Sequence, residues 1–454
     1  MNTSSKTPYL LREDSMPDDE KSYKNDDYDL VADLIQQQYW FITIRETKDI
    51  WYYDKTQGIY KPFGHTIIEE ECQKLIAKCK KQTVAEVIDT IRRNKTYVDR
   101  KELFESKEIN TSNGILNPIT FELDYHSPEY LTKSQLPFSV NFEARNLKLW
   151  NHILTIIDPK DINLIMELIW ICISGNNPFK KMFVFKGITN TQKSTLADII
   201  SCIIGNDNVS REKPTNFLSN GSRFSTKNFI GKNMNVATEI GNLTQSELEN
   251  LKSLVGAELQ NTERKNDNSE IYFDPTQFVF LFTTNNLGKL YSSIDDNSVI
   301  TRFQFIIFRN QLNESKSDGQ WEDKFFINSE DKQSAIDTIV NIVINYKKAQ
   351  SLGKIPKTSW SSIAKTKDIL KEQMPLEDKY FEDNRIVESP GNRLILDEIR
   401  IDFEKFVGYN VKNSEMGNIL KKNGFHTVQS NSKTILKGYS FKNILNDKCQ
   451  VSLA

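Results

Sequence analysis

Short hydrophobic runs alternate with polar segments between residues 182 and 310 of the chain. The run Phe183-Val184-Phe185 predicts a buried strand, and the residues from Leu196 to Ile204 continue with the pattern of a helix. Further strands are predicted within 233–239, 278–285 and 298–308. Unbroken apolar runs are typical of strands that are buried on both faces of a parallel sheet. The alternation of strands and helices therefore predicts an α/β core.

The segments on either side of this core predict further units. An aromatic-rich stretch at 51–60 predicts a small hairpin, and the periodicity of Ile67 to Lys80 predicts an amphipathic helix. Helices are also predicted within 146–175 and 335–349. The predicted units are a disordered acidic tail at 1–28, an N-terminal domain at 29–145, a core at 146–350, a polar linker at 351–377 and a small α/β unit at 378–454.

The composition is that of an ordinary globular protein. The chain has 454 residues, of which 38% are hydrophobic and 26% charged, and its formal net charge is −2. A nucleic-acid site would therefore have to be a local basic patch. Five cysteines without a CxxC pair, together with four histidines, argue against a zinc site and a disulfide framework. The chain shows no secretory leader pattern and no apolar run of about 18 residues, so we expect a cytoplasmic protein without a membrane span.

The segment Gly187-Ile-Thr-Asn-Thr-Gln-Lys-Ser-Thr195 connects the first predicted strand to its helix. A strand, a loop that opens with glycine, a Lys-Ser pair and a helix are the parts of a phosphate-binding P-loop. In such a loop, backbone N–H groups surround the phosphates, the lysine reaches the β- and γ-phosphates, and the hydroxyl binds Mg²⁺. The residues expected to hold the nucleotide are Gly187, Asn190, Thr191, Gln192, Lys193, Ser194 and Thr195.

Gln192 departs from the P-loop pattern, which has glycine directly before the lysine. If this position needs a left-handed backbone conformation, a glutamine there costs about 1–2 kcal/mol. Its side chain would also crowd the nucleotide. Taken alone, the segment fits a chance strand–turn–helix as well as it fits a P-loop, so the rest of the chain has to decide.

Three downstream segments place polar residues at the ends of predicted strands. Glu239 follows one strand and is a candidate for activating water and for binding Mg²⁺. Asn285 ends the run at 278–285 and is a candidate contact to the γ-phosphate, while Arg302 precedes the last strand and is a candidate to enter a neighbouring subunit's site. Each of these residues alone would more often be an ordinary surface or turn residue. Their order after the P-loop makes Glu239, Asn285 and Arg302 the predicted catalytic residues.

With these motifs in place, the chain resembles the superfamily 3 helicases, specifically the poxvirus-type and phage or plasmid primase-helicase group. The P-loop segment resembles the family's motif A. The other matching segments are Val236-Ala-Thr-Glu239 for motif B, Phe282-Thr-Thr-Asn285 for motif C, Thr301-Arg302-Phe303 for the finger arginine, and Asn113-Gly-Ile-Leu-Asn-Pro118 for the preceding domain. The resemblance covers about residues 100–450, and no primase-like catalytic domain is evident.

The resemblance implies an α/β protein with an AAA+-like P-loop core, a preceding mostly α N-terminal domain and a C-terminal winged-helix domain. In the winged helix, Asn413 to Gly424 would be the second helix and Lys433 to Phe441 the wing. The cofactors would be ATP and Mg²⁺, with Ser194 and Glu239 at the metal, in a ring, expected to be hexameric, that moves along single-stranded DNA.

The stretch Gln260 to Phe273 looks like a hairpin that such a ring would point into its pore. There Arg264 and Lys265, and also Lys252, would meet DNA phosphates without reading sequence. An ordinary solvated turn is the alternative for this stretch. Origin duplex DNA and a primase or polymerase are further partners for which the resemblance leaves room.

Two departures from the family pattern keep other functions open. Gln192 replaces the usual glycine, and Glu239 has no second acid beside it. The leading hypothesis is an ATP-dependent replicative DNA helicase of a virus, plasmid or other mobile element. The alternative is a DNA-binding or assembly protein that binds ATP and hydrolyses it poorly. The order of Asn285 and Arg302 argues against a third hypothesis, an unrelated P-loop enzyme such as a small-molecule kinase.

Overall fold

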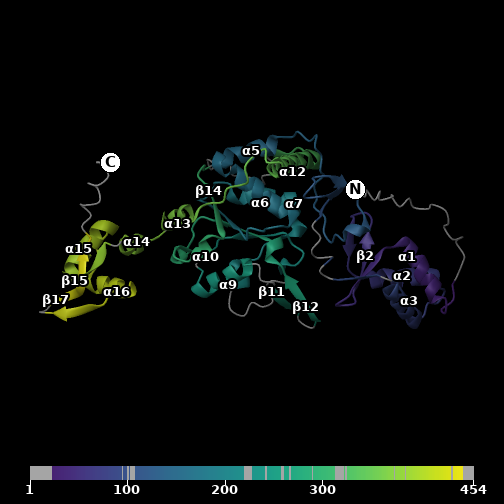
Figure 1. Ribbon diagram of the computed structural model, residues 1–454, viewed down its shortest axis with the longest axis horizontal. Helices are drawn as coiled ribbons and strands as arrows, with labels where there is room; N and C mark the ends of the chain where they lie inside the picture. The colour runs from purple at the N-terminus through teal and green to yellow at the C-terminus, as the bar shows by residue number, and fades with distance from the viewer. Residues whose placement is uncertain are drawn as a thin grey trace.

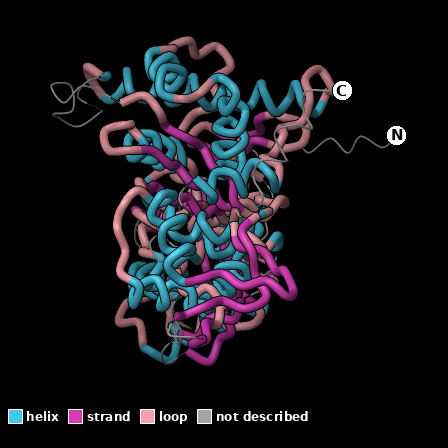
Figure 2. The backbone as a smooth tube through the Cα atoms, turned by 90° about the vertical axis from the view of Figure 1, so that its left-hand side faces the viewer, coloured by secondary structure: helices cyan, strands magenta, loops and turns pink. Residues whose placement is uncertain are grey.

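The chain forms three parts that follow one another along the longest axis of the molecule (Figure 1). The structure is a computed structural model. It describes residues 23–442 except for 95, 100, 101, 103–107, 219–227, 241–242, 257–259, 265–266, 289, 312–321, 323–324, 373, 384 and 431–432. Each part contains both helices and strands, which confirms the α/β class. Figure 2 shows the helices and strands of the whole molecule in cyan and magenta.

The central part is built on a parallel sheet whose strand order is β14-β8-β13-β10-β9. Its strands are β8 Met182–Gly187, β9 Val209–Ser210, β10 Met234–Thr238, β13 Val279–Thr284 and β14 Phe303–Phe308. Every residue of β13 is buried, and so are the first four residues of β8. The strands predicted from the apolar runs are confirmed, because those runs supply side chains to both faces of a covered sheet.

Helices cover both faces of this sheet. One hydrophobic cluster joins Phe183 and Phe185 to α5 Lys148–Ile156, α6 Ile162–Ser174, α7 Lys193–Ile204 and α12 Ser329–Ser351. A second cluster joins Met182 and Val184 of the opposite face to α8 Pro214–Leu218, α9 Gln245–Val255, α10 Asn297–Ile300 and α13 Ile363–Glu372. Because side chains alternate along a strand, β8 contributes to both clusters and the core has three layers. Figure 1 shows α5, α6 and α12 on one side of the sheet and α9 and α10 on the other.

Helix α13 lies in the stretch 351–377, which the sequence predicted to be a linker. Its residues Ile369 and Leu370 are buried against the Phe-rich cluster of the core. The prediction of a plain linker there is therefore wrong for residues 363–372, which pack as part of the central part.

Among its described residues, the N-terminal part has three α-helices and two small sheets. The helices are α1 Tyr28–Gln38, α2 Gly64–Leu75 and α3 Lys81–Arg93. A four-stranded sheet has the order β3-β2-β1-β4, and its strands are β1 Phe41–Ile44, β2 Ile50–Asp54, β3 Ile59–Lys61 and β4 Tyr97–Val98. A second sheet contains β5 Ile109–Thr111, β6 Gly114–Leu116 and β7 Leu123–Asp124. The N-terminal domain is thus mixed α/β and not mostly α as expected. The predicted hairpin at 51–60 is confirmed as β2 and β3.

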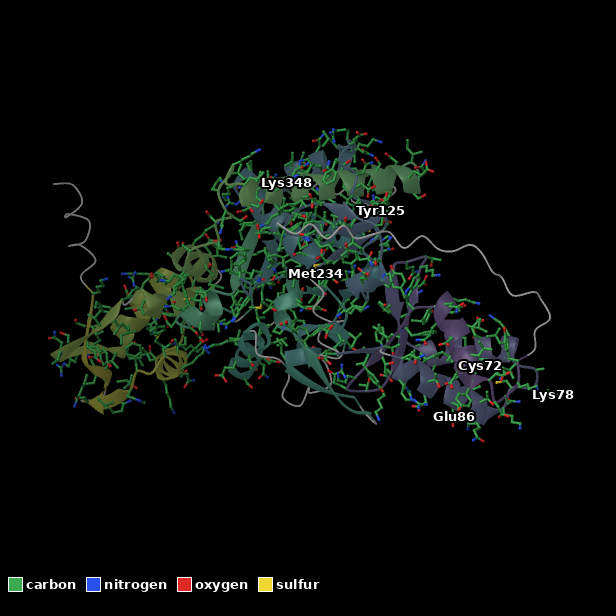
Figure 3. All side chains as sticks on the ribbon, turned by 45° about the vertical axis from the view of Figure 1, so that its right-hand side comes forward. Cys72, Lys78, Glu86, Tyr125, Met234 and Lys348 are labelled. Carbon is green, nitrogen blue, oxygen red and sulfur yellow. The ribbon has the colours of Figure 1, made fainter. Side chains whose placement is uncertain are left out.

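The boundary predicted for the disordered tail, residue 28, is too far along the chain. Residues 1–22 lie outside the described residues, but Tyr23 pairs with Ile76 in a β-bridge, and α1 begins at Tyr28. The labelled residues Cys72, Lys78 and Glu86 mark this part of the molecule, whereas Met234 of β10 lies in the central sheet (Figure 3). Tyr23 therefore already belongs to the folded N-terminal part.

The described residues of the C-terminal part form three α-helices and a three-stranded antiparallel sheet of order β15-β17-β16. Its elements are α14 Leu376–Glu382, β15 Ile386–Ile395, α15 Leu396–Val407, α16 Asn413–Lys422, β16 Thr427–Ser430 and β17 Lys433–Phe441. The helix and strand expected at 413–424 and 433–441 are confirmed as α16 and β17.

Two other expectations concern the chain as a whole. No helix among the described residues is both long and apolar enough to cross a membrane. Cys72, Cys79, Cys172 and Cys202 are free thiols, and the described part of the chain holds no group of three or more His, Cys, Asp and Glu side chains that could bind a metal.

Candidate nucleotide-binding site

The loop between β8 and α7 closes on itself at the carboxyl end of β8. Gly187 ends β8, and a Cβ atom at this residue would lie 2.5 Å from the carbonyl oxygen of Phe308 and 2.9 Å from Oγ1 of Thr191. The Thr191 hydroxyl is buried and donates to the carbonyl oxygen of Ile188 at 2.8 Å. Glycine is needed at 187 because two neighbouring segments approach its backbone closely.

Lys193 begins α7 and turns its side chain back into this loop. Its side chain is largely buried, and Nζ donates to the carbonyl oxygen of Ile188 at 2.7 Å and to Oγ1 of Thr191 at 3.2 Å. Burial lowers the pKa of the Lys193 ammonium. Ser194 is exposed at the start of the helix and Thr195 is half-exposed. The loop therefore gathers an ammonium, a helix N-terminus and an exposed hydroxyl, which together suit a phosphate and its metal ion.

Gln192 adopts the left-handed conformation, with φ 65° and ψ 21°. The sequence analysis gave this conformation as a condition, since the P-loop pattern has glycine at the same position, and the structure meets that condition. Asn190 also has a positive φ, 62°, so two non-glycine residues of one loop are in this unfavourable region. The side chain of Gln192 is fixed by His152 of α5, whose Nε2 lies 2.7 Å from Oε1 of Gln192.

Asn285 and Glu239 follow strands that end at the same edge of the sheet as the loop. Asn285 comes directly after β13, the neighbour of β8, and its Nδ2 donates to Oγ1 of Thr189 at 3.3 Å. Glu239 follows β10, one strand further, and its backbone N–H donates to the carbonyl oxygen of Thr283 at 2.7 Å. Glu239 is exposed and has a φ of 65°. The structure thus joins Asn285 to the loop between β8 and α7 and presents Glu239 at the same carboxyl ends of the strands.

Arg302 lies where the parallel strands begin, at the end of the sheet opposite to the loop between β8 and α7. It precedes β14, whose first residue Phe303 is paired with Met182 at the start of β8. β8 has six residues, so about 3.3 Å per residue places roughly 20 Å between the start of this strand and the loop between β8 and α7. The guanidinium donates to the carbonyl oxygen of Ser298, while Nε is buried and has no partner among the described residues. Burial lowers the pKa of Arg302. Arg302 does not reach the loop between β8 and α7 of its own chain.

Two lysines that the sequence analysis did not single out lie near Arg302. Nζ of Lys180 donates to the carbonyl oxygen of Gly256 at 2.9 Å, and Nζ of Lys181 donates to that of Thr301 at 2.5 Å. Burial lowers the pKa of Lys181, whose Nζ also lies 5.4 Å from the ring centroid of Trp360. The signal that could have found them is the Lys-Lys pair immediately before the strand at 182.

The expected hairpin between the motifs is present as β11 Gln260–Arg264 and β12 Asp267–Phe273. Arg264 is the last residue of β11 and is paired with Asp267 of β12. Lys265 itself lies outside the described residues. Lys252 is on α9 and forms an ion pair with Asp296 at 3.6 Å, beside the start of α10. The carboxylate of Asp296 therefore already neutralises part of the positive charge of Lys252.

Comparisons with known proteins add little to this picture. Residues 185–302, less than half of the chain, match a family described as "Family of unknown function (DUF5906)". No curated protein matches the sequence. Two solved structures that resemble the chain are both apo A forms of the NrS-1 C terminal region. One is 15% identical, with a TM-score of 0.45, and the match covers 90% of this chain and 98% of that one. The other, of residues 305–718, is 13% identical, with a TM-score of 0.46, and the match covers 91% and 100%. Likenesses this remote do not bear on function.

Proposed function

We propose that this chain is an ATP-dependent replicative DNA helicase of a virus, plasmid or other mobile element, and that it works as a ring on single-stranded DNA. The observation that carries the proposal is the closed loop at the carboxyl end of β8, with Lys193 directed into it and Asn285 in contact with it. Ligands of open parallel sheets bind at this edge. The five-stranded parallel order, with the P-loop strand between β14 and β13, supports an AAA+-like core.

Each residue at this edge has a role that its position supports. Lys193 would hold the β- and γ-phosphates, and the backbone N–H groups from Asn190 to Thr195 would surround them. Ser194 and Glu239 supply a hydroxyl and a carboxylate, which are oxygen donors of the kind Mg²⁺ prefers. The metal would neutralise phosphate charge when bound. Glu239 would orient the attacking water, and Asn285 would contact the γ-phosphate.

The opposite edge of the sheet would complete the site of a neighbouring subunit. Arg302 and the nearby Lys180 and Lys181 bring three cations to the amino end of β8 and β14. A cation that enters a phosphate site from the next subunit stabilises the charge that develops during phosphoryl transfer. This arrangement favours a head-to-tail ring, in which each interface uses one edge from each subunit.

DNA would be engaged by two further elements. In the ring, the β11–β12 hairpin would carry Arg264 and Lys265 to the phosphates of one strand, with Lys252 as a further contact. The C-terminal part has the helices and antiparallel strands expected of a winged helix, and the exposed Lys421 and Lys422 end its α16. This unit would bind origin duplex DNA. A primase or polymerase remains a proposed partner of the assembly.

The first test is ATP hydrolysis with and without single-stranded DNA, by the wild type and by Lys193→Ala. We expect hydrolysis that DNA stimulates and that Lys193→Ala reduces at least about 100-fold, because the lysine holds the transferred phosphate. The matched control is Lys354→Ala, which removes an exposed lysine outside the site and should leave turnover unchanged. Hydrolysis that survives Lys193→Ala would refute this site.

One observation favours a second candidate function. Gln192 occupies the position where a glycine would let the loop adapt freely to phosphate, and its side chain is bonded to α5. A loop restrained in this way suits a protein that binds ATP and hydrolyses it slowly, with the nucleotide stabilising an assembly on DNA. Wild-type protein that binds ATP through Lys193 and shows no turnover would establish this second function.

A further inference from the structure

The contact between Gln192 and His152 joins the phosphate loop to a helix that precedes it by 40 residues. Oε1 of the glutamine can only accept a hydrogen bond, so the Nε2–H of His152 donates in this contact. The His152 ring is half-buried and also packs against Phe325, with ring centroids 4.5 Å apart. Two neighbours therefore fix the histidine, and the histidine in turn fixes the glutamine.

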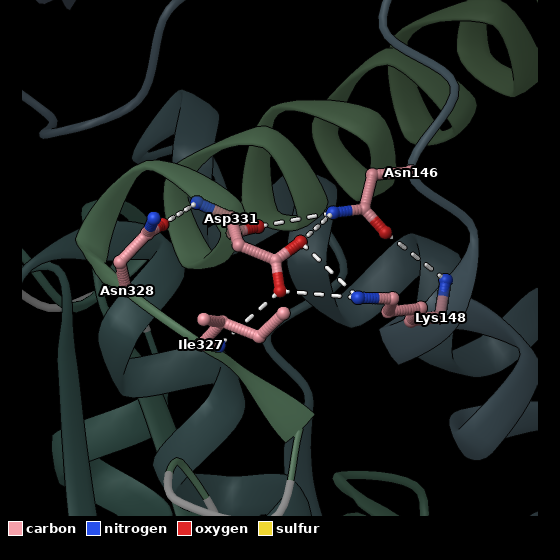
Figure 4. A network of polar contacts seen from close by, with 5 residues as sticks. All are labelled: Asn146, Lys148, Ile327, Asn328 and Asp331. Atoms are coloured by element: carbon pink, nitrogen blue, oxygen red, sulfur yellow. Dashed lines mark hydrogen bonds and ion pairs between the residues drawn. The ribbon is translucent and has the colours of Figure 1, made fainter.

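The helix that carries His152 is itself anchored. Lys148 lies one turn earlier on α5, so Lys148 and His152 share a face of the helix. Nζ of Lys148 pairs with the carboxylate of Asp331 in the first turn of α12 at 3.1 Å, and Asn146 donates to the same carboxylate at 2.8 Å (Figure 4). The network holds the start of α5 against the start of α12. A rigid support thus lies behind the histidine, which is what a positioning group needs.

We propose that His152 is a positioning residue for the phosphate loop, and that its hydrogen bond to Gln192 holds the loop in the left-handed conformation that a glycine would adopt unaided. The inference rests on the proposed function, since it concerns nucleotide binding at this loop. A residue with a Cβ atom disfavours the backbone conformation with φ 65° that the phosphate loop has at position 192. The hydrogen bond offsets this tendency and keeps the amide oxygen, which would repel phosphate oxygens, engaged on α5.

The test is a double-mutant cycle on nucleotide affinity, measured by titration of the full chain with a fluorescent ATP analogue and Mg²⁺. His152→Ala and Gln192→Ala each remove the hydrogen bond and leave a side chain at the left-handed position. Each should weaken binding roughly two- to tenfold, which corresponds to one lost hydrogen bond. Gln192→Gly should bind at least as tightly as the wild type. Adding His152→Ala to Gln192→Gly should then change nothing, because a glycine needs no support.

The rescue by glycine separates positioning from ordinary packing. If His152 only stabilised α5, His152→Ala would weaken binding equally in the wild type and in the Gln192→Gly variant. The absence of a rescue would therefore overturn the inference. Asn151→Ala, at an exposed site next to His152, is the control for changes in α5 and should bind like the wild type. Gln192→Ala with undiminished affinity would also overturn the inference.

Lys193→Ala, titrated in parallel, distinguishes this inference from the proposed function. Wild-type binding that is lost in Lys193→Ala shows that nucleotide occupies the loop, and the cycle then tests His152 alone. Binding that does not depend on Lys193 would remove both the proposed function and the inference built on it.

Discussion

At the scale of single residues, three non-glycine positions of the candidate site have a left-handed backbone conformation, as do six other described residues elsewhere in the chain. Asn190, Gln192 and Glu239 all have φ between 62° and 65°, and all three lie at the carboxyl edge of the central sheet. Positions of this kind persist only where the surrounding structure holds them, and they concentrate at functional sites. For Gln192 the support is visible as the His152 contact. The sequence singled out Gln192 as a position where a left-handed conformation would be strained, but it did not reveal the partner, because 40 residues separate the two and no local pattern connects them.

The same contact predicts how stability responds to acid. Burial lowers the pKa of His152, and the hydrogen bond to Gln192 offsets only part of this effect. As the pH falls below about 6.5, the unfolded chain binds a proton at this residue while the folded chain still resists it. The free energy of unfolding therefore decreases from about pH 6.5 downward, until the pH has passed the lowered pKa of the folded state.

We expect the thermal midpoint of the wild type to fall more steeply between about pH 7.5 and about pH 5.5 than that of His152→Asn, which cannot bind this proton. Thermal unfolding in the absence of nucleotide at several pH values measures the difference between the two slopes. Equal slopes for both proteins would show that His152 does not titrate differently in the folded and unfolded states.

At the scale of elements, the sequence predicted those strands and helices whose residues form a clear local pattern. β8, β13 and β14 were recognisable because strands covered on both faces are apolar along their whole length. The strand order was not predictable, since it depends on contacts between segments far apart in the chain. Helix α13 was missed because its few buried residues, such as Ile369 and Leu370, lie within a polar stretch. The N-terminal sheet was underestimated because its strands have only two to five residues.

The packing of α13 can be tested with a single truncation. Leu370 is fully buried against the core, so Leu370→Ala should lower the free energy of unfolding by about 2–5 kcal/mol through lost contacts and a cavity. Asp368→Ala on the exposed face of the same helix should change it by less than about 0.5 kcal/mol. Denaturant unfolding of both variants provides the comparison. An equally small effect of Leu370→Ala would mean that α13 behaves as a linker after all.

At the scale of the whole molecule, the residues of the proposed site are divided between the two ends of the central sheet, so neither end of one chain holds the complete site. The loop between β8 and α7, Asn285 and Glu239 lie at the carboxyl ends of the strands, and Arg302 lies at their amino ends, roughly 20 Å away by strand length. No movement of side chains alone spans this distance within the folded core. If Arg302 acts on the phosphates, it must therefore do so in a neighbouring copy, and the functional unit is an interface between two chains.

Subunit mixing tests this division of the site. Arg302→Ala should keep nucleotide binding and lose hydrolysis by about 10³-fold or more, and Lys193→Ala should lose hydrolysis as well. When the two variants are mixed before assembly, an interface that takes its P-loop from an Arg302→Ala subunit and its arginine from a Lys193→Ala subunit is intact. Random assembly from equal amounts gives about one quarter intact interfaces in a head-to-tail ring. Turnover well above that of either variant alone is the expected result. Full hydrolysis by Arg302→Ala on its own would remove this residue from the reaction, and a mixed assembly without any gain would contradict a site shared between subunits.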